Sequence, residues 1–275
     1  MPIDQLPGAA PVFLGPPLIT TDADTAGDVV CSDATMHALR NRLYQLDPTA
    51  PCTSVGSVGT ETITAGFWSG ETQFSRSLDC VFILGMNLVR FKVEYSNDNG
   101  ASYATVAGSD YSAADYTGGS SFVLFLAAPI TANKLRLTMY DVTDKTVGVF
   151  DCALTAFQPD GRPMSTFDPN ALQARKEIEL PDGTKDTTCL YWSDNSFTLR
   201  EFACEHDFIS VADKARFDAL FEAPEPFLFM PEPGDDADMV VLSQLKRGTY
   251  FPKYVSQFKG AGYKVNYTTE PLGYV

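Results

Sequence analysis

Apolar and polar residues alternate strictly from Phe91 to Ser96, with sequence FKVEYS. A side-chain period of two predicts a strand that buries one face. The next residues are turn formers, and Asn99 and Gly100 can adopt the positive φ of a tight turn at little steric cost. Residues 103–106 then begin a second apolar stretch. We therefore predict a β-hairpin around Asn99-Gly100.

The same alternation recurs across residues 55–158, separated by segments rich in Gly, Ser, Asn and Asp. Several short strands at this spacing are typical of a β-sandwich or jelly roll. A long polar loop, residues 109–121, is expected at one rim of the sandwich, where loops often carry function. The predicted strands are residues 61–68, 80–84, 88–95, 103–106, 122–126, 134–140 and 147–157.

Residues 1–54 are predicted to form an extended arm with one short helix. Five prolines among residues 1–30 disfavour regular structure, because proline fixes φ and lacks an amide donor. Such an arm would lie across a neighbouring subunit or fray as a tail. The helix, residues 32–44, is expected to be capped by Ser32 or Asp33.

A second domain, residues 176–275, is predicted after a linker at residues 159–175, which opens with two prolines and a glycine. One amphipathic helix, residues 211–221, is expected to be capped by Ser210, with Val211, Phe217, Leu220 and Phe221 on its apolar face. Its predicted strands are residues 176–180, 187–193, 197–204, 227–230, 239–245 and 263–267. The predicted fold class is mainly β: an arm, a β-sandwich jelly roll, and a smaller α+β or β-rich C-terminal domain.

Three strand motifs resemble the galactose-binding-like family (discoidin, or coagulation factor 5/8 type C). They are the FKVEYSNDNG stretch from Phe91, the KLRL stretch from Lys134, and the VGVFD stretch from Val147. The resemblance spans residues 60–158. It implies a jelly-roll fold and a sugar- or surface-binding role, but it transfers no individual binding residue.

The order of elements in the second domain, with its PFLFMPEP strand at residues 226–233, resembles modules of tail and baseplate proteins of tailed bacteriophages. Residues 75–80 and 84–88 are similar to minor tail proteins. This resemblance implies a structural virion subunit that is made in the host cytoplasm and acts through protein–protein interfaces.

The net charge of −15 arises from 20 Lys and Arg against 35 Asp and Glu, and both halves of the chain are acidic. Without a basic face, nucleic-acid binding and attraction to anionic membranes are disfavoured. The first residues have neither a basic nor an apolar leader segment, and no apolar run is long enough to span a bilayer. Secretion through a signal peptide and membrane insertion are therefore not expected.

The six cysteines are scattered without a C-x-x-C pair, which predicts reduced, mostly buried thiols. A bridge between Cys31 and Cys52 is the alternative. His206, between Glu205 and Asp207, is expected to be a partly exposed side chain at a strand end, with a metal ligand as the other interpretation. Residues 235–238 (DDAD) could attract a cation but lack the ligand order of a calcium loop; calcium at the sandwich rim is the remaining metal alternative.

Neither a catalytic motif nor a phosphate-binding loop is present, so we expect no enzymatic activity, no metal and no cofactor. Because aromatic faces stack on sugar rings, three aromatic residues next to loops are the candidate ligand contacts: Trp68, Tyr111 and Tyr116. Packing beneath a loop or at a subunit interface is the alternative role for each.

These patterns predict a structural tail, hub or adaptor subunit that assembles with copies of itself, as a ring, and with other tail proteins. A carbohydrate- or host-surface-binding module that acts in adsorption is the alternative. A glycan hydrolase is the least favoured hypothesis, because no spacing selects a pair of carboxylates.

Overall fold

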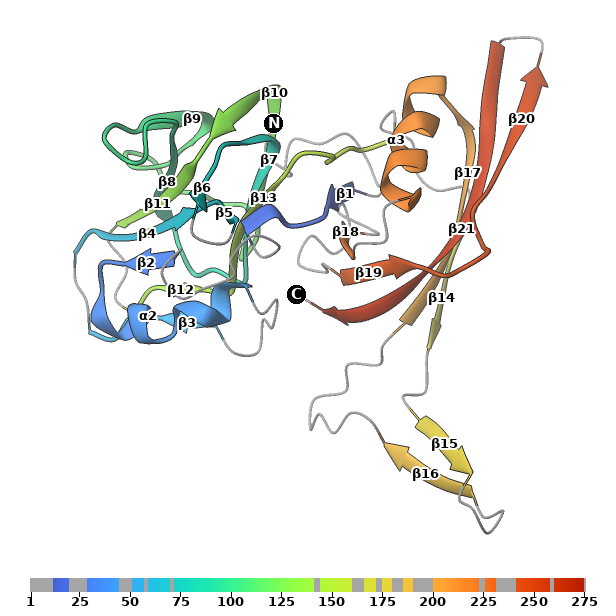
Figure 1. Cartoon of the computed structure of the whole chain (residues 1–275), viewed down its shortest axis with the longest axis horizontal. Coiled ribbons are helices and arrows are strands. Elements are labelled where there is room, and N and C mark those ends of the chain that lie inside the picture. The colour runs from blue at the N-terminus through green and yellow to red at the C-terminus, as the bar shows by residue number, and fades with distance from the viewer. Residues whose placement is uncertain are drawn as a thin grey trace.

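The computed structural model describes residues 12–19, 29–44, 51–56, 59–69, 72–140, 144–159, 166–171, 175–179, 185–189, 200–222, 226–230, 241–257 and 260–274. Within these ranges the chain is mainly β, as predicted, with a sandwich on one side and a second, larger sheet on the other (Figure 1).

The sandwich has a five-stranded sheet and a three-stranded sheet. The five-stranded sheet has the order β2 (Val29–Cys31), β4 (Glu61–Gly66), β11 (Lys134–Tyr140), β8 (Arg90–Ser96) and β9 (Ala104–Asp110). The three-stranded sheet has the order β10 (Phe122–Ala132), β7 (Arg76–Leu84) and β13 (Val149–Ala153). Two short pairs complete it: β3 (Cys52–Thr53) with β12 (Thr146–Val147), and β5 (Trp68–Ser69) with β6 (Thr72–Gln73).

The predicted hairpin joins β8 to β9. Asn99 and Gly100 have φ of 62° and 88°, in the left-handed region that the sequence led us to expect. The Asp98 carboxylate holds this turn, because it accepts hydrogen bonds from the backbone N–H of Ser102 (2.9 Å) and from the Ser96 hydroxyl (2.7 Å). The hydrogen bonds of the turn thus account for the polar side chains of this segment.

The alternation along β8 places Phe91 and Val93 in the core and Glu94 on the outer face of the sheet. Glu94 is nevertheless buried, and its carboxylate accepts hydrogen bonds from Lys92 Nζ (2.8 Å), Arg136 Nε (2.9 Å) and Thr138 Oγ1 (2.9 Å). Burial alone would raise the pKa of Glu94, but these three donors outweigh it and hold the pKa below its usual value. This cross-strand network ties β8 to β11 on the outer face.

The predicted helix at residues 32–44 is divided into α2 (Ala34–Ala38) and the 3-10 helix η2 (Arg40–Tyr44). Asp33 caps α2, since its Oδ1 accepts a hydrogen bond from the Met36 N–H at 2.8 Å. The strand before this helix, β2, pairs with β4, so the sandwich begins before residue 55.

The second sheet has the path β1 (Val12–Gly15), β18 (Phe227–Met230), β19 (Val241–Leu245), β21 (Gly260–Tyr274), β17 (Arg200–Ile209) and β14 (Thr166–Ala171). β20 (Phe251–Gln257) pairs with the first half of β21, and the hairpin of β15 (Arg175–Glu179) and β16 (Lys185–Cys189) lies apart from this sheet (Figure 1). β14 lies within the predicted linker, so the prediction of a linker is wrong for residues 166–171.

The N-terminal segment completes this chain's own second sheet. β1 pairs with β18, and the backbone of Phe13 exchanges two hydrogen bonds with Phe157, at 2.9 and 2.8 Å. Further along, the buried Asp151 carboxylate accepts a hydrogen bond from the Ile19 N–H at 2.7 Å. The prediction of an arm that crosses to a neighbour or frays is therefore wrong for residues 12–19.

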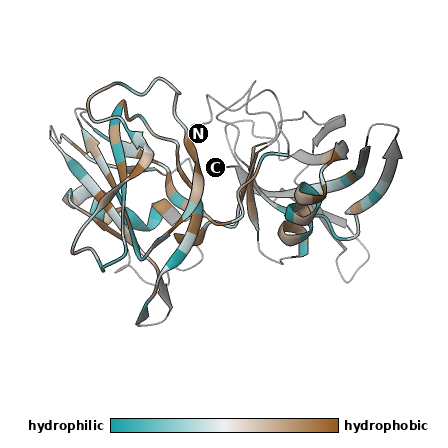
Figure 2. Cartoon of the chain, turned by 90° about the horizontal axis from the view of Figure 1, so that it is seen from above, coloured by the Kyte–Doolittle hydropathy of each residue, from teal (hydrophilic) through white to brown (hydrophobic). Residues whose placement is uncertain are grey.

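A shared apolar layer joins the sandwich to the second sheet (Figure 2). On β7, Val81 and Ile83 face the sandwich core. The alternate residues Cys80, Phe82 and Leu84 face β1 and β18. Because β7 is buried on both faces, its sequence shows a continuous apolar run instead of alternation. The members of this layer are Val12, Leu14, Cys80, Phe82, Leu84, Val123, Val149, Ala153, Leu228 and Met230.

The helix α3 (Val211–Glu222) packs over a core rich in aromatic rings on the other side of β1 and β18. Ser210 caps it as predicted, with its Oγ accepting a hydrogen bond from the Asp213 N–H at 3.0 Å. Val211 is 65% exposed and does not belong to the apolar face, whereas Phe217, Leu220 and Phe221 do. None of the helices in the described ranges is long and apolar enough to cross a membrane.

Candidate functional site

The two predicted ligand tyrosines lie in an aromatic cluster beneath the rim loop of the sandwich. The rings of Phe91, Tyr111, Tyr116 and Phe122 have centroids 5.0–5.9 Å apart. Tyr116 is only 5% exposed, and its hydroxyl donates a hydrogen bond to the Ser121 carbonyl at 2.5 Å. Its ring anchors the loop, so the prediction of a ligand contact is wrong for Tyr116.

The other two predicted contacts are Tyr111 and Trp68. Tyr111 is half-buried and packs against the sandwich core. Trp68 begins the short strand β5, where it pairs with Gln73, and its side chain lies outside the described residues.

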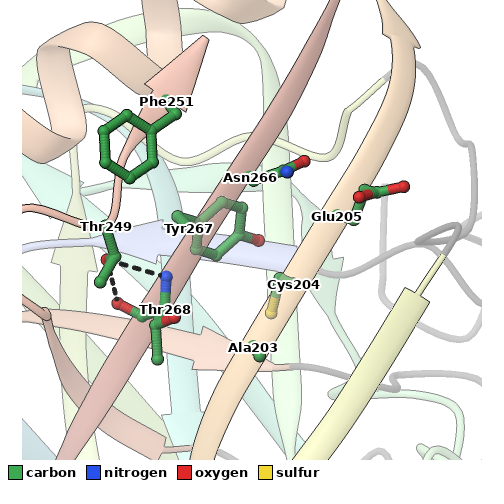
Figure 3. A pocket seen from close by; sticks show the side chains of 8 residues that line it. All are labelled: Ala203, Cys204, Glu205, Thr249, Phe251, Asn266, Tyr267 and Thr268. Carbon is green, nitrogen blue, oxygen red and sulfur yellow. Dashed lines mark hydrogen bonds between the residues drawn. The ribbon is translucent and has the colours of Figure 1, made fainter.

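A hollow of about 340 Å³ lies on the second sheet, where β17, β21 and β20 run side by side (Figure 3). Its volume is within the range of small-ligand sites. Strand register explains its composition, because Asn266 of β21 is opposite Glu205 of β17 on one side and opposite Phe251 of β20 on the other. The full lining is Ala203, Cys204, Glu205, Thr249, Phe251, Asn266, Tyr267 and Thr268.

Phe251 gives the hollow an exposed aromatic ring, with 65% of the residue accessible to solvent. Asn266 is exposed, and Glu205 is half-buried. An aromatic face next to a carboxylate and an amide offers both stacking and directional hydrogen bonds to one ligand.

The Glu205 carboxylate is held in place by its neighbours. Its Oε1 accepts a hydrogen bond from Lys264 Nζ, and its Oε2 accepts one from the Asn266 amide at 3.2 Å when that amide is oriented to satisfy its surroundings.

The residues beneath and beside Phe251, Asn266 and Glu205 fix the shape of the hollow. The Thr249 hydroxyl accepts a hydrogen bond from the Thr268 N–H (3.0 Å) and donates to the Lys246 carbonyl (2.7 Å), which fixes the entry to β20. Cys204 and Tyr267 belong to the core beneath the sheet. Burial raises the pKa of Cys204 to about 12, so its thiol stays protonated at neutral pH and is a poor nucleophile.

His206 points to the opposite face of β17 from Glu205 and is buried in the aromatic core. It is 1% exposed, stacks on Tyr267, and lies 3.0 Å through Nε2 from the Tyr267 hydroxyl. The prediction of a partly exposed His206 is therefore wrong, because the alternation of side chains along β17 places His206 on the buried face of the strand. Among the described residues no three His, Cys, Asp or Glu side chains are grouped to hold a metal. Residues 235–238 lie outside the described residues.

No protein-family model and no curated protein matches the sequence. Solved structures match with low TM-scores. The module CpGH89CBM32-6 of Clostridium perfringens has a TM-score of 0.39 at 12% identity over 48% of this chain and 97% of the module. The family 32 carbohydrate-binding module of C. perfringens NanJ, solved with galactose, has a TM-score of 0.37 at 10% identity over 52% of this chain and 98% of that one.

A third match is a variant of chitosan-binding module 1 from the chitosanase/glucanase of Paenibacillus sp. IK-5. Its TM-score is 0.39 at 16% identity, over 50% of this chain and 98% of the module. These neighbours are therefore carbohydrate-binding modules, each matching about half of this chain.

Sequence reasoning missed the hollow because it depends on β20, which was not predicted. Pro252 lies within that strand, and proline argues against an interior strand. β20 tolerates it because it is bonded to β21 on one side only. The available signal was the presence of two aromatic residues, Phe251 and Tyr254, in this short segment.

Proposed function

We propose that this chain is a non-catalytic binding protein that recognises carbohydrate at the hollow between β17, β21 and β20. The observation that carries the proposal is the exposed Phe251 ring on one side of the Asn266 amide, with the fixed Glu205 carboxylate on the other side. A sugar presents an apolar C–H face and a ring of hydroxyl groups. The ring of Phe251 would stack on the first, and the amide and carboxylate would bond to the second.

The open form of the hollow suits a surface glycan, since a chain of sugars can pass across an open site without its ends being enclosed. The resemblance of the sandwich motifs to the galactose-binding-like family supports a role in surface recognition. The proposed site, however, lies on the C-terminal sheet and not at the sandwich rim.

Phe251→Ala is expected to weaken binding to the best glycan of an array by about tenfold, because a lost apolar contact of this size is worth about 1.5 kcal/mol. Tyr254→Ala is the matched control. Tyr254 is 59% exposed on the same strand, but the strand alternation places it on the opposite face. Dissociation constants of the wild type and both variants for that glycan, measured by calorimetry, provide the comparison.

The proposed function fails if the wild-type protein binds no glycan. If binding is unchanged in Phe251→Ala but reduced in Tyr111→Ala, the site lies at the sandwich rim and the assignment to the hollow is wrong.

The second candidate function is the predicted one, a structural subunit of a phage tail that assembles with its own copies. One observation favours docking at the β20–β21 hairpin. Lys253 lies directly opposite Lys264 in register, an arrangement of like charges that is unfavourable within one sheet and that the ion pair of Lys264 with Glu205 offsets only in part. Residues 244–264 carry five Lys and Arg and no Asp or Glu, in a chain with a net charge of −15. The acidic surface of a second copy would complement the positive charge of this segment.

Lys253→Glu is expected to weaken self-association at least tenfold, and rising NaCl concentration is expected to do the same to the wild type. Light scattering after size-exclusion chromatography would measure both effects. Lys134→Glu makes the same charge change on the sandwich and is the control. A wild-type protein that stays monomeric at high concentration and low salt contradicts this candidate.

A further inference from the structure

Two buried thiols from separate elements of the sandwich lie in the same apolar core. Cys31 is the last residue of β2, opposite Ile63, and Cys52 begins β3, opposite Val147. Cys31 is 6% exposed and Cys52 is fully buried. Both lie next to α2, since the Cys31 N–H donates a hydrogen bond to His37 Nδ1 at 3.3 Å and Cys52 Sγ donates one to the Met36 carbonyl at 3.3 Å. The segment between the two thiols contains α2 and η2.

The surroundings make the two thiols unequal. The hydrogen bond from Cys31 and the positive charge of Arg42 lower the pKa of Cys52, against the effect of burial. The hydrogen bond to Cys52 and burial raise the pKa of Cys31, and together they outweigh the positive charge of Arg40, which lowers it. A thiolate is the attacking species in disulfide exchange, so Cys52 is the better nucleophile of the two. Because Cys52 is fully buried in the folded chain, the exchange would take place during folding, before this thiol is covered.

We propose that Cys31 and Cys52 form a reversible disulfide that closes residues 32–51 into a loop and fixes α2 and η2 on the sandwich. Three of the other cysteines are buried in separate places. Cys80 lies in the layer between the sandwich and the second sheet, Cys152 in the sandwich core, and Cys204 beneath the second sheet. The pair would remain reduced in a reducing cytoplasm and become oxidised in an oxidising environment.

The oxidant is a low-molecular-weight disulfide, for which oxidised glutathione is the probe. The Cys52 thiolate attacks one sulfur of the glutathione disulfide, forming a mixed disulfide and releasing one glutathione thiolate, which takes up a proton. Cys31 then loses its proton and attacks Cys52 Sγ, which releases the second glutathione. Two protein thiols and one glutathione disulfide thus give one protein disulfide and two glutathione thiols.

The test refolds the full-length chain in a glutathione buffer set to an oxidising or a reducing ratio. Free thiols are then trapped with N-ethylmaleimide in guanidinium chloride, and the intact mass is measured. With six cysteines in the chain, the oxidised wild type is expected to take up four maleimides and the reduced protein six. A digest should contain one cross-linked peptide, joining Cys31 to Cys52. The Tm of the oxidised protein should be higher by about 5 °C.

Two variants make the result specific. Cys31→Ser is expected to take up five maleimides in either buffer, because Cys52 then has no partner. Cys80→Ser replaces a thiol that is also fully buried, and should take up three after oxidation. Six maleimides on the wild type in the oxidising buffer, or cross-links that join other cysteines, would overturn the proposal.

Discussion

Phe13→Ala is expected to lower the free energy of unfolding by about 3–5 kcal/mol, the cost of truncating a fully buried phenylalanine. Phe13 has no exposed surface, and its ring lies within 6.5 Å, centroid to centroid, of six other aromatic rings. Those rings come from the end of the sandwich, α3, β18 and β21: Phe157, Phe217, Phe221, Phe227, Phe229 and Tyr267. A cavity here would affect every element of the second core.

Chemical denaturation monitored by near-ultraviolet circular dichroism would measure this loss. The same substitution at the exposed Phe251 is the matched control and should change stability by less than about 0.5 kcal/mol. If Phe13→Ala were no more destabilising than Phe251→Ala, β1 would not be part of the second core in solution.

The strands with one buried face could be predicted from the sequence because their pattern is local. β8 alternates for its whole length, and the positive φ of the following turn requires residues such as Asn99 and Gly100. The cap of α3 by Ser210 is equally local. Each of these features is determined by residues a few positions apart, so one sequence is enough to find them.

The strands that were missed are governed by tertiary contacts. β1 is only four residues long and is buried on both faces, so it has no alternation that would distinguish it from an apolar stretch in a proline-rich tail. β14 contains Pro169, which is tolerated because β14 is an edge strand of the sheet. Edge position and two-sided burial cannot be read from the order of residues alone.

The role of Tyr116 was mispredicted for a related reason. Aromatic residues next to polar loops fit either a ligand contact or an anchor beneath the loop, and burial decides between them. Tyr116 is an anchor, whereas Phe251 keeps its ring in solvent. The hollow also requires three strands in one register, which brings together residues from positions 205, 251 and 266.

The apolar layer between the sandwich and the second sheet leads to the last prediction. Phe82 lies on β7, is fully buried, and packs in the cluster shared with β1 and β18. Two bodies joined only by a linker would unfold separately, but a buried layer of this kind couples them. Phe82→Ala is therefore expected to cost about 3–5 kcal/mol and to lower the Tm of a single transition that includes both sheets.

Differential scanning calorimetry would distinguish coupled from independent unfolding. The control is Leu154→Ala, just after β13 in the same part of the sandwich, because Leu154 is 43% exposed and should shift the Tm little. Two resolved transitions, of which Phe82→Ala moves only one, would contradict the coupling. A single transition that moves as a whole would mean that residues 12–15 and 227–230 stabilise the sandwich as well as their own sheet, because Phe82 packs in one cluster with residues of both strands.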